Sequence, residues 1–201
     1  MADMGKNRRR QLEAEDTLHG TTLSVDSVEE QDFVNWLCEA AELSVVQDFS
    51  YQPPSFRLFE NAKYVDVCGK TRTLFLDHVY TCDFVVAFCP SAQPVLAKEM
   101  KTPYSQLSCA QTSAYVDTKG TFNLNRRSFA TDRKWVWNKY GVYVAEVVPV
   151  RFFAKFGVPR KSFCSKKTKK ARKAFAGMKS ISQAFGLNAR NLKPIHVADA
   201  D

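Results

Sequence analysis

The chain of 201 residues contains no apolar run close to the roughly 18 to 20 residues that a membrane-spanning helix needs. Residues 1–10 are basic but no apolar segment follows them, so the sequence predicts neither a transmembrane nor a secreted protein. None of the six cysteines forms a Cys-x-x-Cys pair, which argues against a zinc or redox site. We expect reduced thiols in a cytoplasm.

Acidic residues are missing from one long segment. Residues 151–194 hold 13 of the 29 Lys and Arg residues and no Asp or Glu, so this segment carries +13 and the rest of the chain −5. Charge concentrated in this way favours binding to phosphates, and we expect a nucleic-acid partner. A solvated helix face is the other interpretation. The densest basic run consists of Lys166, Lys167, Lys169, Lys170, Arg172 and Lys173.

The hydrophobic fraction of 45% is enough for a sizeable core, and its pattern predicts a domain organisation. We expect a disordered polar tail over residues 1–26, a core over 27–150 and a basic, mainly helical extension over 151–201. Within the extension, residues 179–192 have the pattern of two short helices around a turn. This pattern fits either a fragment of a helix-turn-helix or a docking helix pair.

The core pattern predicts an α/β domain in which helices cover a central sheet. An apolar stripe that includes Phe33, Trp36 and Leu37 predicts a first helix, with Ser27 as N-cap and Glu30 completing a capping box. Strands are expected in residues 49–59, 74–88 with a break near Asp77, 113–119 and 142–150, with a loop or short strand near 95–97. A second helix is expected in 122–140, ended by Gly141.

Two acidic residues interrupt strands where chemistry is expected. Asp83 lies in the most hydrophobic run, and Asp117 lies two residues before Lys119, so Asp117 and Lys119 share a strand face. Charges brought together in a core are costly unless they are paired or bind a metal. Carboxylate oxygens suit Mg²⁺, and a lysine can orient a water and stabilise charge at phosphorus. A turn aspartate and a surface ion pair are the plain alternatives.

Together these motifs resemble the PD-(D/E)XK nuclease superfamily, and most closely its phage-type Holliday-junction resolvases and small phage endonucleases. The resemblance covers roughly residues 29–149. It rests on an acidic residue opening a helix, Tyr-Thr-Cys-Asp-Phe around Asp83, and Val-Asp-Thr-Lys-Gly around Asp117 and Lys119. It implies a restriction-endonuclease-like αβββαβ core, with an insertion between the second and third strands. Cys82 stands where the family has proline.

The resemblance also implies roles for these residues. Asp83 and Asp117 would bind Mg²⁺, for which Mn²⁺ would substitute, and Lys119 would position the attacking water. Glu30 is the chosen third carboxylate and metal ligand, with Glu29 and Glu39 as alternatives. DNA-backbone contacts would come from the helix after Gly120 and from the basic extension. In that helix the expected DNA-binding residues are Arg126, Arg127, Arg133 and Lys134.

The expected activity is therefore metal-dependent hydrolysis of phosphodiester bonds in DNA, with branched or Holliday-junction DNA as one substrate. A homodimer is a hypothesis that goes with this activity, because paired nicks need two active sites. A non-catalytic nucleic-acid-binding protein on the same fold is the alternative from another class. A site-specific nicking enzyme or an RNA-cleaving enzyme would use the same residues.

Overall fold

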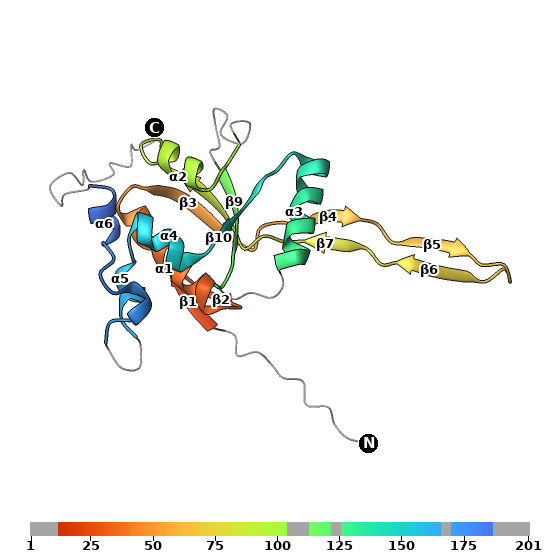
Figure 1. The fold of residues 1–201 in the computed structure, drawn as a ribbon, viewed down its shortest axis with the longest axis horizontal. Coiled ribbons are helices and arrows are strands. Elements are labelled where there is room, and N and C mark those ends of the chain that lie inside the picture. The colour runs from red at the N-terminus through yellow and green to blue at the C-terminus, as the bar shows by residue number, and fades with distance from the viewer. Residues whose placement is uncertain (1–11, 104–112, 122–125, 166–169, 187–201) are drawn as a thin grey trace, which may run out of the picture. The chain divides into compact units, whose positions relative to one another are not determined.

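The computed structural model describes residues 12–103, 113–121, 126–165 and 170–186 (Figure 1). They form two compact units, one made of Val46–Val148 and one drawn from Met1–Val45 and Pro149–Asp201. The first predicted helix thus falls in the same unit as the basic extension, and the boundaries expected at 27, 150 and 151 stay predictions. No helix in these described ranges is both long and apolar enough to cross a bilayer.

A four-stranded mixed sheet forms the centre of the Val46–Val148 unit. Its strands are β3 (Val46–Tyr51), β8 (Phe84–Phe88), β9 (Ser113–Thr118) and β10 (Val144–Val147), in the order β10-β9-β8-β3. β8 pairs antiparallel with β3 and β9, whereas β10 pairs parallel with β9. A parallel pair needs a crossover, which α3 (Arg126–Tyr140) supplies. The predicted mixed α/β class, with a central sheet flanked by helices, is confirmed.

Local sequence explains several of these elements. Phe84, Val86 and Phe88 alternate along β8 and are fully buried, as strand periodicity requires. Gly141 ends α3 with a φ of +66°, a conformation that glycine adopts without strain. The segment between β8 and β9 contains α2 (Gln93–Glu99), with a proline in its first turn. The short strand considered near residues 95–97 is therefore wrong.

Residues 56–80 form two successive strand pairs, which we call the arm (Figure 1). β4 (Phe56–Phe59) pairs with β7 (His78–Tyr80), and further out β5 (Ala62–Val65) pairs with β6 (Thr71–Phe75). The expected buried strand over residues 74–88 is wrong for its first half, because these residues pair within an exposed two-stranded ribbon. Only β8 enters the central sheet.

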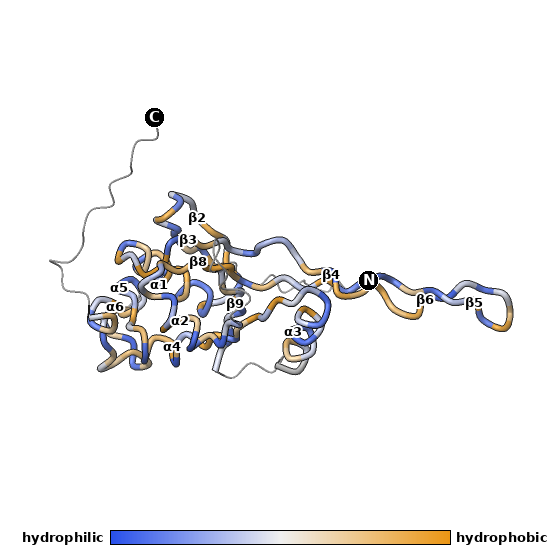
Figure 2. The backbone as a smooth tube through the Cα atoms, turned by 90° about the horizontal axis from the view of Figure 1, so that it is seen from above, coloured by the Kyte–Doolittle hydropathy of each residue, from blue (hydrophilic) through white to orange (hydrophobic). Residues whose placement is uncertain are grey.

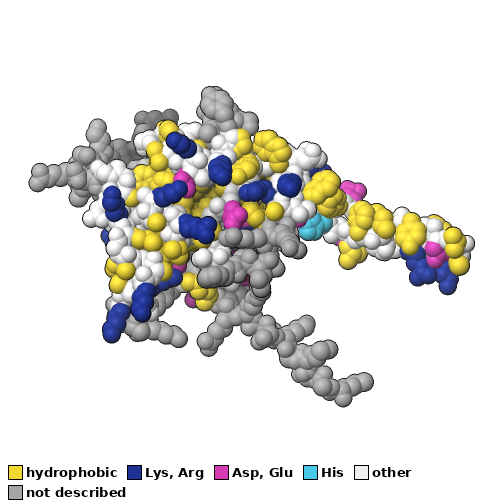
Figure 3. Space-filling view, viewed as in Figure 1, with side chains coloured by type: hydrophobic (Ala, Val, Ile, Leu, Met, Phe, Trp, Pro, Cys, Tyr) yellow, Lys and Arg dark blue, Asp and Glu magenta, His cyan; other side chains and the backbone are white. Residues whose placement is uncertain are grey.

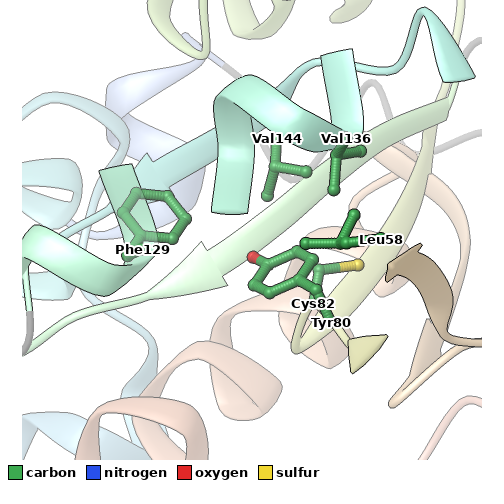
Figure 4. Packing of buried hydrophobic residues seen from close by; sticks show 6 residues of the cluster. All are labelled: Leu58, Tyr80, Cys82, Phe129, Val136 and Val144. Carbon is green, nitrogen blue, oxygen red and sulfur yellow. The ribbon is translucent and has the colours of Figure 1, made fainter. Parts of the chain in front are cut away.

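The base of the arm is anchored on α3 and the sheet. The Tyr140 hydroxyl donates to the Arg57 carbonyl over 2.7 Å, and the rings of Phe59 and Trp135 lie 4.7 Å apart. Figure 4 shows Leu58 and Tyr80, from the base of the arm, facing Val136 and Val144. The buried cluster consists of Leu58, Tyr80, Cys82, Phe129, Val136 and Val144. The arm is therefore held at its base by a hydrophobic core.

The other unit packs short helices around α1 (Val28–Glu42). Phe33 and Trp36 are fully buried on α1, and the Trp36 ring lies 4.8 Å from the Phe152 ring. Ser27 accepts from the Glu30 amide, as the predicted N-cap requires. The helical elements after residue 148 are α4 (Pro149–Phe156), α5 (Arg160–Phe163), the 3₁₀ helix η2 (Lys173–Phe175) and α6 (Ile181–Ala184).

The expected disordered tail is wrong for residues 12–25, which form a β-hairpin. β1 (Leu12–Asp16) pairs antiparallel with β2 (Thr21–Val25), and Ala14 and Val25 are buried. The Gln31 side chain donates to the carbonyl of Glu13. The hairpin packs against α1. Its strands are short and mostly polar, so their sequence shows no strand periodicity from which the hairpin could be predicted.

The helix pair expected in residues 179–192 is described only in its first part. Ser180 and Gln183 form a capping box that begins α6, and Gly186 follows it with a φ of +64°. Residues 187–192 lie outside the described residues. The helix-turn-helix and docking-pair interpretations therefore both stay predictions.

Candidate nuclease-like site

Strand register brings the two predicted aspartates opposite each other. Phe84 of β8 pairs with Val116 of β9, so extending this antiparallel register by one residue places Asp83 opposite Asp117. The Asp83 carboxylate accepts hydrogen bonds of 2.6 Å from both the backbone amide and the hydroxyl of Thr118. These bonds fix Asp83 against the end of β9.

Asp117 is buried, with 3% of its surface exposed, and both of its oxygens accept hydrogen bonds. Oδ2 accepts from the Tyr80 hydroxyl over 2.6 Å, and Oδ1 forms an ion pair with Lys119 Nζ. The Lys119 ammonium also lies 5.1 Å from the ring centroid of Phe129, on α3. Its backbone amide donates to the Val147 carbonyl over 2.8 Å. Asp117 and Lys119 thus share a strand face as predicted, in a largely buried pair.

Burial controls the protonation of two neighbours of this pair. Burial, followed by the Asp117 charge, raises the pKa of the Tyr80 phenol above its usual range, so Tyr80 stays a hydrogen-bond donor. Burial and the nearby carboxylates raise the pKa of the Cys82 thiol to about 12. Cys82 is therefore protonated near neutral pH and is a poor nucleophile. Sequence patterns gave no sign of Tyr80, because only the folded β7 brings it to Asp117.

The donor set at this end of the sheet consists of carboxylate oxygens, which suit Mg²⁺ or Mn²⁺. Each Asp117 oxygen has a second lone pair beyond its hydrogen bond, so the geometry leaves acceptor capacity for a cation. Glu146 of β10 pairs in register with Asp117 and is exposed, and sequence reasoning missed it. Within the described residues, no cluster of three or more His, Cys, Asp or Glu residues is arranged to hold a metal.

Glu30, the predicted third carboxylate, belongs to the other compact unit. Its oxygens accept from the Asp26 amide over 3.0 Å and from the Ser27 hydroxyl over 2.8 Å, so the N-cap is confirmed and the full capping box stays a prediction. The alternative Glu39 accepts from the Arg160 amide over 2.7 Å, and Glu29 is partly exposed. A metal-binding role for any of the three stays a prediction.

The predicted DNA-binding residues of α3 differ in their surroundings. The Arg133 guanidinium lies 5.3 Å from the Phe129 ring centroid and 5.5 Å from that of Tyr143, whereas Lys134 is exposed. Arg126 and Arg127 lie in the first turn of α3, and their side chains are outside the described set.

In the basic extension, one predicted contact is already engaged within the protein. Arg172 pairs with both oxygens of the buried Asp32, at 2.7 and 2.8 Å, and its guanidinium lies 4.4 Å from the Phe175 ring centroid. Lys170 and Lys173 are exposed. Lys166, Lys167 and Lys169 lie outside the described residues.

Comparisons with protein-family models, with curated proteins and with solved structures find no match to this chain.

Proposed function

We propose that this protein is a metal-dependent endonuclease of the PD-(D/E)XK type that hydrolyses phosphodiester bonds in DNA, with Mg²⁺ as cofactor and Mn²⁺ as a substitute. The observation that carries the proposal is the placement of Asp83 opposite Asp117 on neighbouring strands, with Lys119 paired to Asp117. Two carboxylates can hold a divalent ion, and an ammonium beside them can stabilise the charge that develops at phosphorus during hydrolysis.

Topology supports the same proposal. In chain order the structure has α1, β3, β8, β9, α3 and β10, and the four strands lie side by side as β3-β8-β9-β10. The first three strands are antiparallel neighbours, and the fourth joins in parallel after the crossover helix. When β1, β2, α2 and the arm are left out, this order agrees with the αβββαβ order that the resemblance implies. The arm is an insertion between the first two strands, and α2 lies between the second and third, where the resemblance implies an insertion.

Each residue of the site has a role in the proposal. Asp83 and Asp117 would hold the divalent ion, which supplies positive charge at the scissile phosphate. Lys119 would orient the attacking water and offset negative charge that develops at phosphorus. Tyr80 is a positioning residue, because its hydroxyl holds one oxygen of Asp117 in place. Lys134, Lys170 and Lys173 would contact the DNA backbone.

The test is cleavage of labelled linear duplex, single-stranded and four-way-junction DNA and of RNA, with Mg²⁺ or with EDTA. The full-length protein is compared with Asp117→Asn and Lys119→Met. Asp48→Asn and Lys98→Met are matched controls, because they remove the same charges from exposed positions on β3 and α2.

We expect Mg²⁺-dependent cutting that both site variants lose and both controls keep, with DNA binding retained throughout. Cutting that Asp117→Asn retains at the level of Asp48→Asn would refute the site. The relative rates of cleavage then show whether junction DNA, linear DNA or RNA is the preferred substrate.

A non-catalytic nucleic-acid-binding protein is the second candidate. It is favoured by the hydrogen bonds to both Asp117 oxygens, which stabilise that carboxylate without a metal. Binding of DNA without cleavage of any substrate in the panel would establish this second function.

A further inference from the structure

The outer part of the arm, residues 62–75, is a two-stranded hairpin whose side chains are almost all exposed. Every residue of β6 and all of β5 except Ala62 are exposed, in contrast to the anchored base formed by β4 and β7. An isolated two-stranded ribbon buries too little surface to gain stability from a core of its own. A surface of this kind is therefore a candidate for contact with another molecule.

The tip of the hairpin is well ordered around Asp66. Its carboxylate accepts hydrogen bonds of 2.9 Å from the amides of Cys68 and Lys70 and from the Arg72 guanidinium. The Lys70 amide, followed by the Arg72 side chain, holds the pKa of Asp66 below its usual range, so the turn stays intact at neutral pH. This turn leaves the Val67 side chain fully exposed at the tip.

Apolar and basic side chains are combined on this hairpin. Residues 62–75 contain Lys63, Lys70 and Arg72 but a single acidic residue, Asp66. Figure 3 shows Lys and Arg side chains beside hydrophobic ones at the tip of the arm, and Figure 2 shows hydrophilic and hydrophobic stretches along β5 and β6. The exposed large apolar residues of the hairpin and its flank are Tyr64, Val65, Val67, Leu74, Phe75 and Leu76.

Strand register distributes these side chains over both faces. Tyr64 pairs with Arg72 on one face, and Lys63 pairs with Thr73 on the other. Arg72 is paired with Asp66 near the tip, so the net positive charge of the hairpin comes from the exposed Lys63 and Lys70. Positive charge beside exposed apolar side chains favours a partner that offers both phosphates and bases.

We propose that residues 62–75 form a DNA-binding arm that enters a groove of duplex DNA, with Lys63 and Lys70 against phosphates and Val67 against the bases. The proposal rests on the DNA-binding part of the proposed function. The DNA major groove admits a two-stranded ribbon, and apolar side chains in that groove contact the methyl group of thymine. A second copy of the hairpin is a poorer partner, because it would place net positive charge against net positive charge.

Binding of the full-length protein to a fluorescent duplex, measured by anisotropy in EDTA over a range of salt concentrations, tests the arm. We compare Lys63→Gln/Lys70→Gln with the matched pair Lys98→Gln/Lys101→Gln, which are exposed lysines outside the arm. A lost phosphate contact lowers the slope of log K against log salt by about 0.9, so the arm pair is expected to lower it by roughly 2.

Val67→Ser is the second variant, and its position is too exposed for the change to affect folding. It is expected to weaken duplex binding several-fold while leaving the salt slope unchanged. Equal slopes for the arm pair and the control pair, or unchanged affinity for Val67→Ser, would overturn the proposal. So would sedimentation that shows a dimer dissociating in the arm variants, which would assign the hairpin to a second copy.

Because binding is measured in EDTA, the result is independent of cleavage. If cutting fails on every substrate but the arm variants still lose duplex affinity, the nuclease proposal fails and the arm proposal stands. If cutting is normal and the arm variants bind duplex DNA like their controls, the arm proposal fails and the nuclease proposal stands.

Discussion

Replacing Lys119 with methionine tests whether the Asp117–Lys119 pair is a buried ion pair. Methionine keeps an unbranched apolar stem beside Phe129 but removes the ammonium that neutralises Asp117. The pair is largely buried, since 16% of the Lys119 side chain and 5% of the Asp117 side chain are exposed. The substitution therefore leaves a buried carboxylate that keeps the hydrogen bond from Tyr80 but loses the positive charge that balances it.

The size of the effect follows from that geometry. Breaking a buried pair by removing one partner costs about 3 to 5 kcal/mol. Tyr80 continues to donate to Asp117 Oδ2 over 2.6 Å, which places the expected loss near the lower end, at about 3 kcal/mol. For a chain of this size each kcal/mol lowers Tm by roughly 2 to 4 °C, so a decrease of about 6 to 12 °C is expected.

Urea unfolding without divalent ions measures the effect, with Lys98→Met as the exposed control. The double variant Asp117→Asn/Lys119→Met removes both charges and should recover part of the loss, because no uncompensated charge remains. A loss below about 1 kcal/mol for Lys119→Met would show that water screens the pair as at a surface. If the loss in the free energy of unfolding of the double variant equals the sum of the losses of the two single variants, the pairing is also refuted.

Three further predictions concern neighbouring features. Tyr80→Phe removes the hydrogen bond to Asp117 and is expected to cost about 1.5 to 3 kcal/mol, read from the urea midpoint; an unchanged midpoint would contradict the bond. Because burial and carboxylates raise the pKa of Cys82 to about 12, mass spectrometry after alkylation at pH 8 should find exposed Cys68 modified and Cys82 intact. Rapid Cys82 modification in the folded protein would contradict that burial. Gly157 has a φ of +86°, and a Cβ there would lie 2.4 Å from backbone at the start of α6, so Gly157→Ala should cost at least about 1 to 2 kcal/mol in thermal unfolding; a neutral result would contradict this packing.

The sequence predicted the elements whose signals are local. The apolar stripe through Phe33 and Trp36 required a helix, and Ser27 marked its start. β9 was predicted as residues 113–119 and is observed at Ser113–Thr118. Gly141 marked the end of α3 because a positive φ is cheap only for glycine. These features depend on residues near in sequence and hardly on the rest of the fold.

The arm was not predicted because the hydrophobicity of a segment does not show whether other elements pack against it. Leu74 and Leu76 belong to the same apolar run as Phe84, yet Leu74 and Leu76 are exposed and Phe84 is fully buried. The expected break near Asp77 was the one correct sign, since β6 ends at Phe75 and β7 begins at His78. Whether a strand is buried depends on the strands it pairs with, and the periodicity of a single segment does not reveal those partners.

The candidate site was only partly predictable for the same reason. Alternation along one strand placed Asp117 and Lys119 together, but their pairing with Asp83 depends on the register between β8 and β9. Tyr80 of β7 donates to Asp117 and Glu146 of β10 pairs with it in backbone register, and neither residue has a sequence signal. The register between strands depends on the whole sheet. A single sequence therefore identifies candidate residues on each strand but does not show which of them lie together in the fold.

Charge counting overstates how much of the basic extension is available to DNA. Arg160, Lys161 and Arg172 form ion pairs with acidic residues of α1 and β1, so their charges also stabilise the unit that contains them. Truncation after residue 151 would strand the buried Asp32, and a loss of DNA binding would then reflect unfolding as much as lost contacts. Substituting the exposed Lys173 by Gln separates the two causes, because a salt slope that falls in a protein of unchanged stability reports a lost DNA contact and not unfolding.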